Sequence, residues 1–300
     1  TRSYREVISE PETWREVRGF GVDRLEKLLK RLTISFVLAI AVYAGITLYA
    51  DLEGLRESLS RFPVHVFFWA CLLACGNYFL RFLKWQFYLR HLDIQVPWPR
   101  SLGVFLSGFV MSVTPGKIGE VLKAYLLKCS QGVSMARTAP VVLGERITDL
   151  IAILLLTLAG VSTIPSARAL VFVGGGLVLV LVVVISWEGL CLKVLGAIAR
   201  IPLFRGVARK IEDFYGSMAA LLKPWPLLVA GILSLAAWGM EAVAFYLILT
   251  AFSGVEAELL TAVFIYSSST AAGALSFLPG GLGVTEGGMI ALLVKTVEGA

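Results

Sequence analysis

Two carboxylates and an arginine occupy positions 145–149 of an otherwise apolar stretch, and their spacing suits the binding of an ionic group. Residues three and four apart share a helix face, so Glu145 and Asp149 lie on one side and Arg146 can pair with Asp149. Two carboxylates on one face need a cation from another segment or a bound proton. Such a pair can hold a cation or an amine, or exchange a proton.

Further charged residues fall in apolar surroundings, and at membrane depth each of them is costly and indicates function by default. The cations are Arg81, Lys84, Lys117, Lys123 and Arg146, and the anions are Glu120, Glu145, Asp149, Glu241 and Glu286. Lysine and arginine suit a phosphate or a carboxylate group. A neutral ion-pair network that only holds helices together is the alternative. Arg81 and Lys84 could instead reach the inner headgroups with their long side chains.

The same pattern, S-x-x-P-G-x-x-G, occurs twice, as "SVTPGKIG" at 112–119 and "SFLPGGLG" at 276–283. Proline and glycine end helices, and glycine lets backbone or ligand approach closely. A helix that begins just after such a break offers free N–H groups and partial positive charge to an anion. The candidate substrate-binding residues in and just after these motifs are Ser112, Pro115, Gly116, Lys117, Gly119, Tyr125, Pro279, Gly280, Gly283 and Thr285.

The composition places these residues in a membrane. The chain of 300 residues is 57% hydrophobic and 16% charged, whereas soluble domains carry roughly a quarter charged residues. The mean hydropathy is +0.81. A spanning helix needs about 20 apolar residues, and the segments that qualify are 32–50, 62–80, 138–160, 169–187 and 225–252. The sequence therefore predicts an all-α integral membrane protein, a polytopic helical bundle.

Basic residues indicate the orientation of these spans. Residues 1–31 hold eight Lys and Arg and residues 188–223 hold six, whereas the loops 51–61, 161–168 and 253–258 hold two, one and none. Because basic loops stay in the cytoplasm, we expect a multi-pass protein of the inner (cytoplasmic) membrane with a cytoplasmic N-terminus. The basic segments 1–31 and 188–223 read as cytoplasmic amphipathic helices at the membrane surface.

This orientation holds only if residues 101–128 enter and leave on the cytoplasmic side, as a re-entrant hairpin. Each limb has about a dozen residues and reaches roughly halfway across a ~30 Å core. The same reasoning inserts 259–297 from outside, so the transmembrane domain 32–300 would contain two inverted re-entrant helical hairpins, which is typical of a transporter's midplane site. Alternatively, both motifs are ordinary turns, 101–128 is one broken span, and 188–223 lies outside.

Motifs for several other chemistries are missing from the sequence. Ile118 follows Lys117, so the G-x-x-x-x-G-K-[ST] phosphate loop fails. Neither H-E-x-x-H nor G-x-S-x-G occurs, and only two histidines are present, so we expect no metal and no cofactor. Cys71 and Cys75 share a helix face and are expected to be small buried residues. Carboxylates alone can do acid–base work, so an enzyme stays open as an alternative.

Three stretches together resemble a known family: "TPGKIGEVLKAYLLK" at 114–128, "GVSMARTAPVVLGERITDL" at 132–150 and "LPGGLGVTEGG" at 278–288. They look like the signature of the flippase-like, lysylphosphatidylglycerol synthase transmembrane superfamily, and "RFLKW" at 81–85 is similar to its basic segment. The resemblance covers roughly 30–300 and implies a domain that translocates a lipid. Stand-alone relatives are linked to glycolipid, polyprenyl-phosphate and hopanoid pathways. No synthase domain accompanies these residues, so aminoacyl transfer is not expected, and relatives usually carry a further span after the second hairpin.

We therefore expect a translocase (flippase) that moves a polar-headgroup lipid, such as a phospholipid, a glycolipid or a polyprenyl-phosphate carrier. The lysines and Arg81 would bind phosphate, and the carboxylates would balance that charge or hold an amine or a coupling proton. The alternatives are a membrane-embedded lipid-modifying enzyme, with Glu145 and Asp149 as acid and base, and a non-catalytic subunit of a lipid-synthesis complex. The expected partners are membrane lipids and no nucleic acid, with a second copy of the chain or a lipid-synthesis enzyme as candidate protein partners.

Overall fold

The computed structural model describes residues 56–57, 60–110, 120–161, 208–252, 254–276 and 278–297, together with positions 172, 175, 176 and 180. Within these residues the secondary structure consists of eight α-helices and one short 3-10 helix, without a β-strand. The expected N-terminal arm, the span 32–50, all but four positions of the span 169–187, and the first Pro-Gly motif at 112–119 lie outside the described residues.

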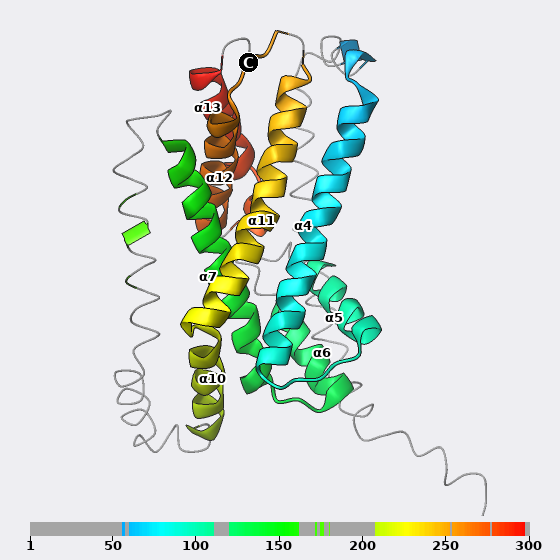
Figure 1. Cartoon of the computed structure of the whole chain (residues 1–300), viewed down its shortest axis with the longest axis vertical. Helices are drawn as coiled ribbons and strands as arrows, with labels where there is room; N and C mark the ends of the chain where they lie inside the picture. The colour runs from blue at the N-terminus through cyan, green and yellow to red at the C-terminus, as the bar shows by residue number, and fades with distance from the viewer. Residues whose placement is uncertain are drawn as a thin grey trace, which may run out of the picture.

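Three long helices run along the molecule: α4 (Val64–His91), α7 (Met135–Gly160) and α11 (Pro224–Thr250). In Figure 1, α4 descends from the upper to the lower end, whereas α7 and α11 ascend. α4 and α11 pack along each other, and α7 packs on α11. Among the described helices, α4 and α11 are long and apolar enough to cross a membrane. The fold is therefore that of a helical membrane protein, with helices at three of the expected spans.

Two pairs of shorter helices lie at opposite ends of this bundle. α5 (Trp98–Val110) and α6 (Leu122–Gln131) lie in the lower half of Figure 1, between the end of α4 and the start of α7. α12 (Leu259–Leu275), the 3-10 helix η5 (Pro279–Gly281) and α13 (Val284–Thr296) lie in the upper half. These pairs overlap the segments 101–128 and 259–297, with α5 beginning at residue 98 and α6 ending at residue 131, and their re-entrant insertion stays a prediction.

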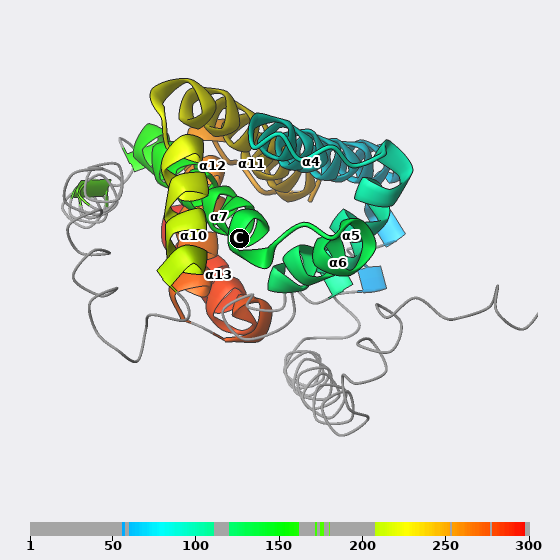
Figure 2. The same ribbon diagram turned by 90° about the horizontal axis from the view of Figure 1, so that it is seen from below.

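The helix α10 (Ala208–Leu221) packs against α7 at the lower end of the molecule (Figure 2). Its two faces differ as the spacing predicts. Met218 and Leu221 are buried against the bundle, and the charged face is exposed at Arg209, Lys210, Glu212 and Asp213. An amphipathic helix of this kind suits the boundary between apolar bundle and water.

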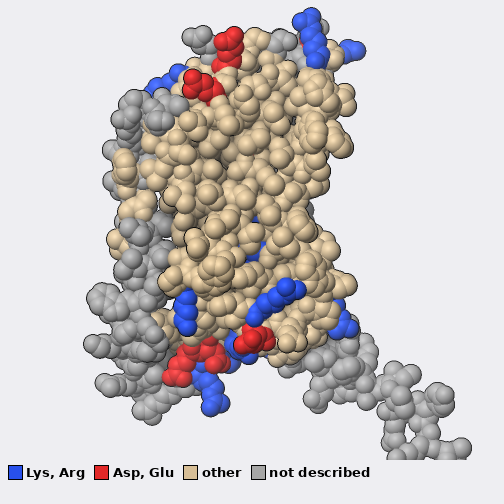
Figure 3. All heavy atoms as spheres, in the orientation of Figure 1, with Lys and Arg blue, Asp and Glu red and all other residues tan. Residues whose placement is uncertain are grey.

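On the face shown in Figure 3, the described residues form two charged ends with a wide apolar band between them. Apart from a small basic patch at mid-height, the band on this face carries no charged side chain. Large apolar side chains of α4, including Phe67, Phe68 and Phe79, are exposed, as expected for a helix that faces lipid chains. Cys71 and Cys75 are exposed on the same helix. The expectation that they are buried was wrong, because sequence spacing does not say which face of an all-apolar helix turns outward.

The turn between α12 and α13 depends on glycine. Gly280, Gly281 and Gly283 have φ angles of 65°, 73° and 82°, a region that other residues rarely adopt. The two helices also approach closely, since a Cβ added to Gly273 would collide with Thr285 Oγ1. The second Pro-Gly motif therefore builds a tight helical hairpin.

Gly160→Ala is expected to weaken the packing of α7 on α12. A Cβ at this position would collide with the Leu260 carbonyl oxygen and lie 2.6 Å from Phe264 Cβ, and overpacking of this kind costs about 1–3 kcal/mol. Thermal unfolding in detergent should show a lower Tm. Gly231→Ala is the matched control, because its Cβ would meet nothing within 4 Å. Equal Tm values for the two variants would contradict this packing.

Candidate functional site

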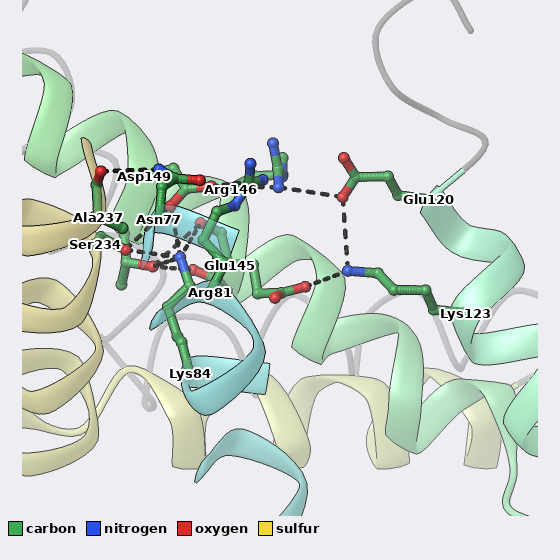
Figure 4. Close-up of polar contacts among 12 residues, drawn as sticks. Asn77, Arg81, Lys84, Glu120, Lys123, Glu145, Arg146, Asp149, Ser234 and Ala237 are labelled. Carbon is green, nitrogen blue, oxygen red and sulfur yellow. Dashed lines mark hydrogen bonds and ion pairs between the residues drawn. The ribbon is translucent and has the colours of Figure 1, made fainter. Parts of the chain in front are cut away.

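Seven charged side chains from α4, α7, α6 and the residues just before α6 form one connected set of ion pairs, here called the charged cluster (Figure 4). Its members are Arg81, Lys84, Glu120, Lys123, Glu145, Arg146 and Asp149. Six of these side chains are 0–10% exposed, and Arg146 is 25% exposed. The structure therefore brings together seven of the residues that the sequence singled out.

Asp149 is the centre of one half of the cluster. Its Oδ1 lies 2.5 Å from Lys84 Nζ, and its Oδ2 lies 3.6 Å from Arg81 Nη2. Oδ2 also lies 3.2 Å from Arg146 Nη2, which confirms the i,i+3 pair predicted along α7. One buried carboxylate thus faces three cations from two helices.

Lys84 joins three long helices. It is fully buried, and its ammonium donates to Asp149 Oδ1 at 2.5 Å, to Thr148 Oγ1 at 3.3 Å and to Ser234 Oγ at 2.7 Å. Ser234 Oγ in turn donates to Asp149 Oδ1 at 3.1 Å. An ammonium has three protons to donate, so all the hydrogen-bond donors of Lys84 are used by these three partners. The alternative that Lys84 extends to the inner headgroups is wrong.

The other half of the cluster ties α6 to α7. Lys123 Nζ lies 2.5 Å from Glu145 Oε2, so α6 supplies to α7 a cation from another segment, one of the two possibilities that the sequence left open. Glu120 Oε2 lies 3.2 Å from Arg146 Nη2 and 3.7 Å from Lys123 Nζ. Arg146 therefore contacts carboxylates of both halves (Figure 4).

Aromatic rings flank two of the cations. The Arg81 guanidinium lies 5.3 Å from the ring centre of Phe109 and 5.7 Å from that of Trp238. Lys123 Nζ lies 4.8 Å from the Trp85 ring and 5.5 Å from that of Phe105. Cations at these distances are attracted to the ring faces, more strongly where water is excluded. The rings therefore favour charged side chains at positions that water cannot solvate.

A small pocket opens beside these cations. Its lining is Arg81, Phe105, Gly108, Phe109, Glu120, Lys123 and Glu145. Gly108 leaves room for the Lys123 side chain beside the pocket, because a Cβ at position 108 would lie 2.7 Å from Lys123 Cγ. The absence of a side chain on α5 thus lets Lys123 pass to Glu145. Both signs of charge line this pocket, which suits an ionic ligand group.

The charged cluster carries one positive charge in excess, since its ion pairs join four cations and three anions. Glu241, on the neighbouring helix α11, accepts a hydrogen bond from the Tyr266 hydroxyl and forms no ion pair with a described cation. Within the described ranges, no group of His, Cys, Asp and Glu side chains could hold a metal ion. An anion is the ligand that would balance the cluster.

The predicted site residues of the second motif lie in the α12–α13 hairpin. Glu286 Oε2 accepts a hydrogen bond from the Gly283 backbone N–H at 2.7 Å and so caps α13. Thr285 packs against Gly273 and Gly281. Tyr125 is half-buried on α6. Ser112, Pro115, Gly116, Lys117 and Gly119 lie outside the described residues, so a meeting of the two motifs stays a prediction.

Sequence reasoning missed several residues that complete the site. Thr148 and Ser234 bind Lys84, and Asn77 donates from Nδ2 to the Ala237 carbonyl oxygen at 2.8 Å, joining α4 to α11. Tyr266 binds Glu241. The only sequence signal for these residues was a polar side chain in an apolar span. This signal is weak, because Ser and Thr hydroxyls also form hydrogen bonds to the backbone of their own helix.

The helical bundle and its buried charged cluster define a polytopic membrane protein with an ionic site. Residues 36–300 match the lysylphosphatidylglycerol synthase transmembrane region, and the chain belongs to this family. The family predicted from the three motifs is thereby confirmed.

Archaeal membrane proteins are among its relatives. The chain is 23% identical over 287 residues to a UPF0104 membrane protein of Pyrococcus horikoshii, which covers 86% of this chain and 84% of the relative. It is 27% identical over 283 residues to a UPF0104 membrane protein of Methanothermobacter thermautotrophicus, covering 86% and 83%. No solved structure gives a significant match.

Proposed function

We propose that this protein is a translocase that moves a lipid with a polar, phosphate-bearing headgroup across the cytoplasmic membrane. The observation that carries the proposal is the charged cluster, which is buried among apolar helices, opens to a pocket and has one cation in excess. Apolar side chains of similar size often hold helices together as well as buried ion pairs do. A costly ionic cluster in a membrane protein therefore favours an ionic ligand.

In this proposal the headgroup enters the pocket while the lipid tails stay in the membrane. Arg81 and Lys123 line the pocket, and Arg146 is the most exposed member of the cluster, so these three side chains would hold the phosphate. Lys84 is already saturated and would instead fix Asp149 between the long helices. The membership in a family named for a lipid synthase supports a lipid as the ligand.

The two helix pairs would supply alternating access. We propose that α5–α6 is re-entrant from the cytoplasm and α12–α13 from outside, with the N-terminus in the cytoplasm. Their placement at opposite ends of the long helices supports this arrangement, as does the basic segment at 188–223. Broken helices at membrane depth are tolerated where they line a cavity, which is what a headgroup site requires.

Cysteine accessibility tests this topology. In a variant without the native cysteines, single cysteines at Arg100 and Ser130 should react with a membrane-impermeant maleimide from the cytoplasmic side. Single cysteines at Glu258 and Lys295 should react from outside, because each hairpin would return to the side from which it entered. All four positions are exposed. Reaction of positions 100 and 130 from opposite sides would instead make 101–128 one broken span.

Reconstitution into vesicles with headgroup-labelled lipids tests the function itself. A change in the sidedness of a lipid without a change in its mass is the result expected of a translocase. A change in lipid mass would show a lipid-modifying enzyme, and neither change would favour a non-catalytic subunit. Phosphatidylglycerol, a glycolipid and a polyprenyl phosphate are the probes, compared with vesicles that lack the protein.

A further inference from the structure

Two carboxylate oxygens of the charged cluster, Glu120 Oε2 and Asp149 Oδ2, each lie between two cations without forming a hydrogen bond to either. Glu120 Oε2 lies 3.2 Å from Arg146 Nη2 and 3.7 Å from Lys123 Nζ, and it is buried without a hydrogen-bond partner. Arg146 Nε is also buried without a partner among the described residues. Buried polar atoms are nearly always hydrogen-bonded, so the cation pair around Glu120 has donor capacity that the protein leaves unused.

The other two carboxylates of the cluster each accept a short hydrogen bond, and Asp149 accepts it through Oδ1 although its Oδ2 has no partner. Glu145 lies 2.5 Å from Lys123, and Asp149 lies 2.5 Å from Lys84 and accepts a second hydrogen bond from Ser234. Both belong to the long helix α7, whereas Glu120 precedes the short helix α6. Glu120 can therefore leave its cations without a shift of α4, α7 or α11.

The position of Glu120 is that of an anion between an arginine and a lysine. A guanidinium offers a planar fork that matches phosphate oxygens, and a lysine adds a point charge. Glu120 and Lys123 also line the pocket, whose volume of about 10 Å³ is that of a single water molecule, so a phosphate group fits there only when Glu120 moves away. With Glu120 displaced, four cations face two carboxylates, and the single negative charge of a phosphodiester replaces the one that Glu120 supplied.

From these contacts we infer that Glu120 occupies the phosphate seat of the site, and that an anionic phosphate group binds by displacing this carboxylate from Arg146 and Lys123. The inference rests on the proposed function for the source of the phosphate, a lipid headgroup. Glu120 then sets the affinity of the site: it keeps the seat filled when no cargo is present and weakens binding enough for release.

Binding measurements on Glu120→Gln test the inference. Glutamine keeps the shape of the side chain but removes the charge that competes with the ligand. Dihexanoyl phosphatidylglycerol and inorganic phosphate are the probes, and tryptophan fluorescence reports binding, because Trp85 lies against Lys123. We expect the variant to bind the lipid about tenfold more tightly than the unchanged protein, an ordinary size for coupling between competing groups.

Glu212→Gln is the matched control, because it removes the same charge from the exposed face of α10 and should leave the affinity unchanged. If Glu120→Gln also binds inorganic phosphate more tightly, the site recognises the phosphate group alone. If only the lipid binds more tightly, the site recognises the headgroup as a whole. Both results support the inference. Equal or weaker binding of both probes by Glu120→Gln would overturn it. If that variant does not fold, Glu120→Asp, whose shorter side chain retreats from Arg146, must bind more tightly.

These outcomes separate the seat from the translocase. Tighter binding by Glu120→Gln, in a protein that moves no lipid in vesicles, would keep the seat and reject the translocase. Lipid movement without a gain in binding would reject the seat alone.

Discussion

Asp149→Asn will destabilise the protein more than any other single change in the charged cluster. The Asp149 carboxylate lies within 4.0 Å of cationic nitrogens of Lys84, Arg81 and Arg146, and Lys84 is fully buried. Asparagine keeps the size of the side chain but leaves these cations without their shared anion. Removal of one partner of a buried ion pair costs about 3–5 kcal/mol. Thermal unfolding in detergent or nanodiscs should show a large fall in Tm, with poor yield of folded protein.

Asp213→Asn on the exposed face of α10 is the control, and it should leave the Tm unchanged. Adding Lys84→Gln to Asp149→Asn should recover part of the loss, because it removes the cation that burial penalises most. A Tm of Asp149→Asn equal to that of the unchanged protein would show that these contacts do not hold the bundle together.

Arg146→Gln will abolish lipid movement and leave the protein folded. Arg146 is the most exposed member of the cluster, and both of its carboxylate partners keep another cation, Lys123 for Glu120 and Lys84 for Asp149. The substitution removes the excess positive charge and the guanidinium that would hold the phosphate. We expect the rate of lipid movement in vesicles to fall by at least about tenfold, as for other desolvated charge contacts.

Arg146→Lys serves as the control for charge. It keeps the positive charge but loses the planar fork, so it should retain part of the activity. A normal melting curve for Arg146→Gln shows that the loss is functional. An unchanged rate of lipid movement would remove Arg146 from the site and leave the cluster as a structural network.

Local spacing predicted the part of the site that lies along single segments. Arg146 and Asp149 pair on α7, because residues three apart share a helix face. Charge balance also predicted that the two carboxylates of α7 need a cation from another segment or a bound proton, and Lys123 of α6 supplies a cation to Glu145. The helices fit the expected segments because apolar length and Pro-Gly breaks determine them.

Contacts between helices could not be predicted in the same way. From the sequence alone Lys84 could reach the headgroups, but the packing of α4 on α11 places Ser234 beside it. Which hydroxyl of an apolar helix faces a neighbour depends on the rotation of both helices, and an all-apolar sequence leaves that rotation open. The same reason explains why Cys71 and Cys75 are exposed rather than buried.

The most direct test of the translocase follows a fluorescent lipid in vesicles. Phosphatidylglycerol with a dithionite-sensitive label is placed in both leaflets, and dithionite is added outside. With the unchanged protein, fluorescence should fall beyond the outer-leaflet fraction, because inner-leaflet lipid moves outward and is reduced, whereas vesicles with Arg146→Gln should retain the inner-leaflet signal. Loss of only the outer-leaflet fraction with the folded, unchanged protein, for phosphatidylglycerol and for the glycolipid and polyprenyl phosphate probes, would contradict a lipid translocase.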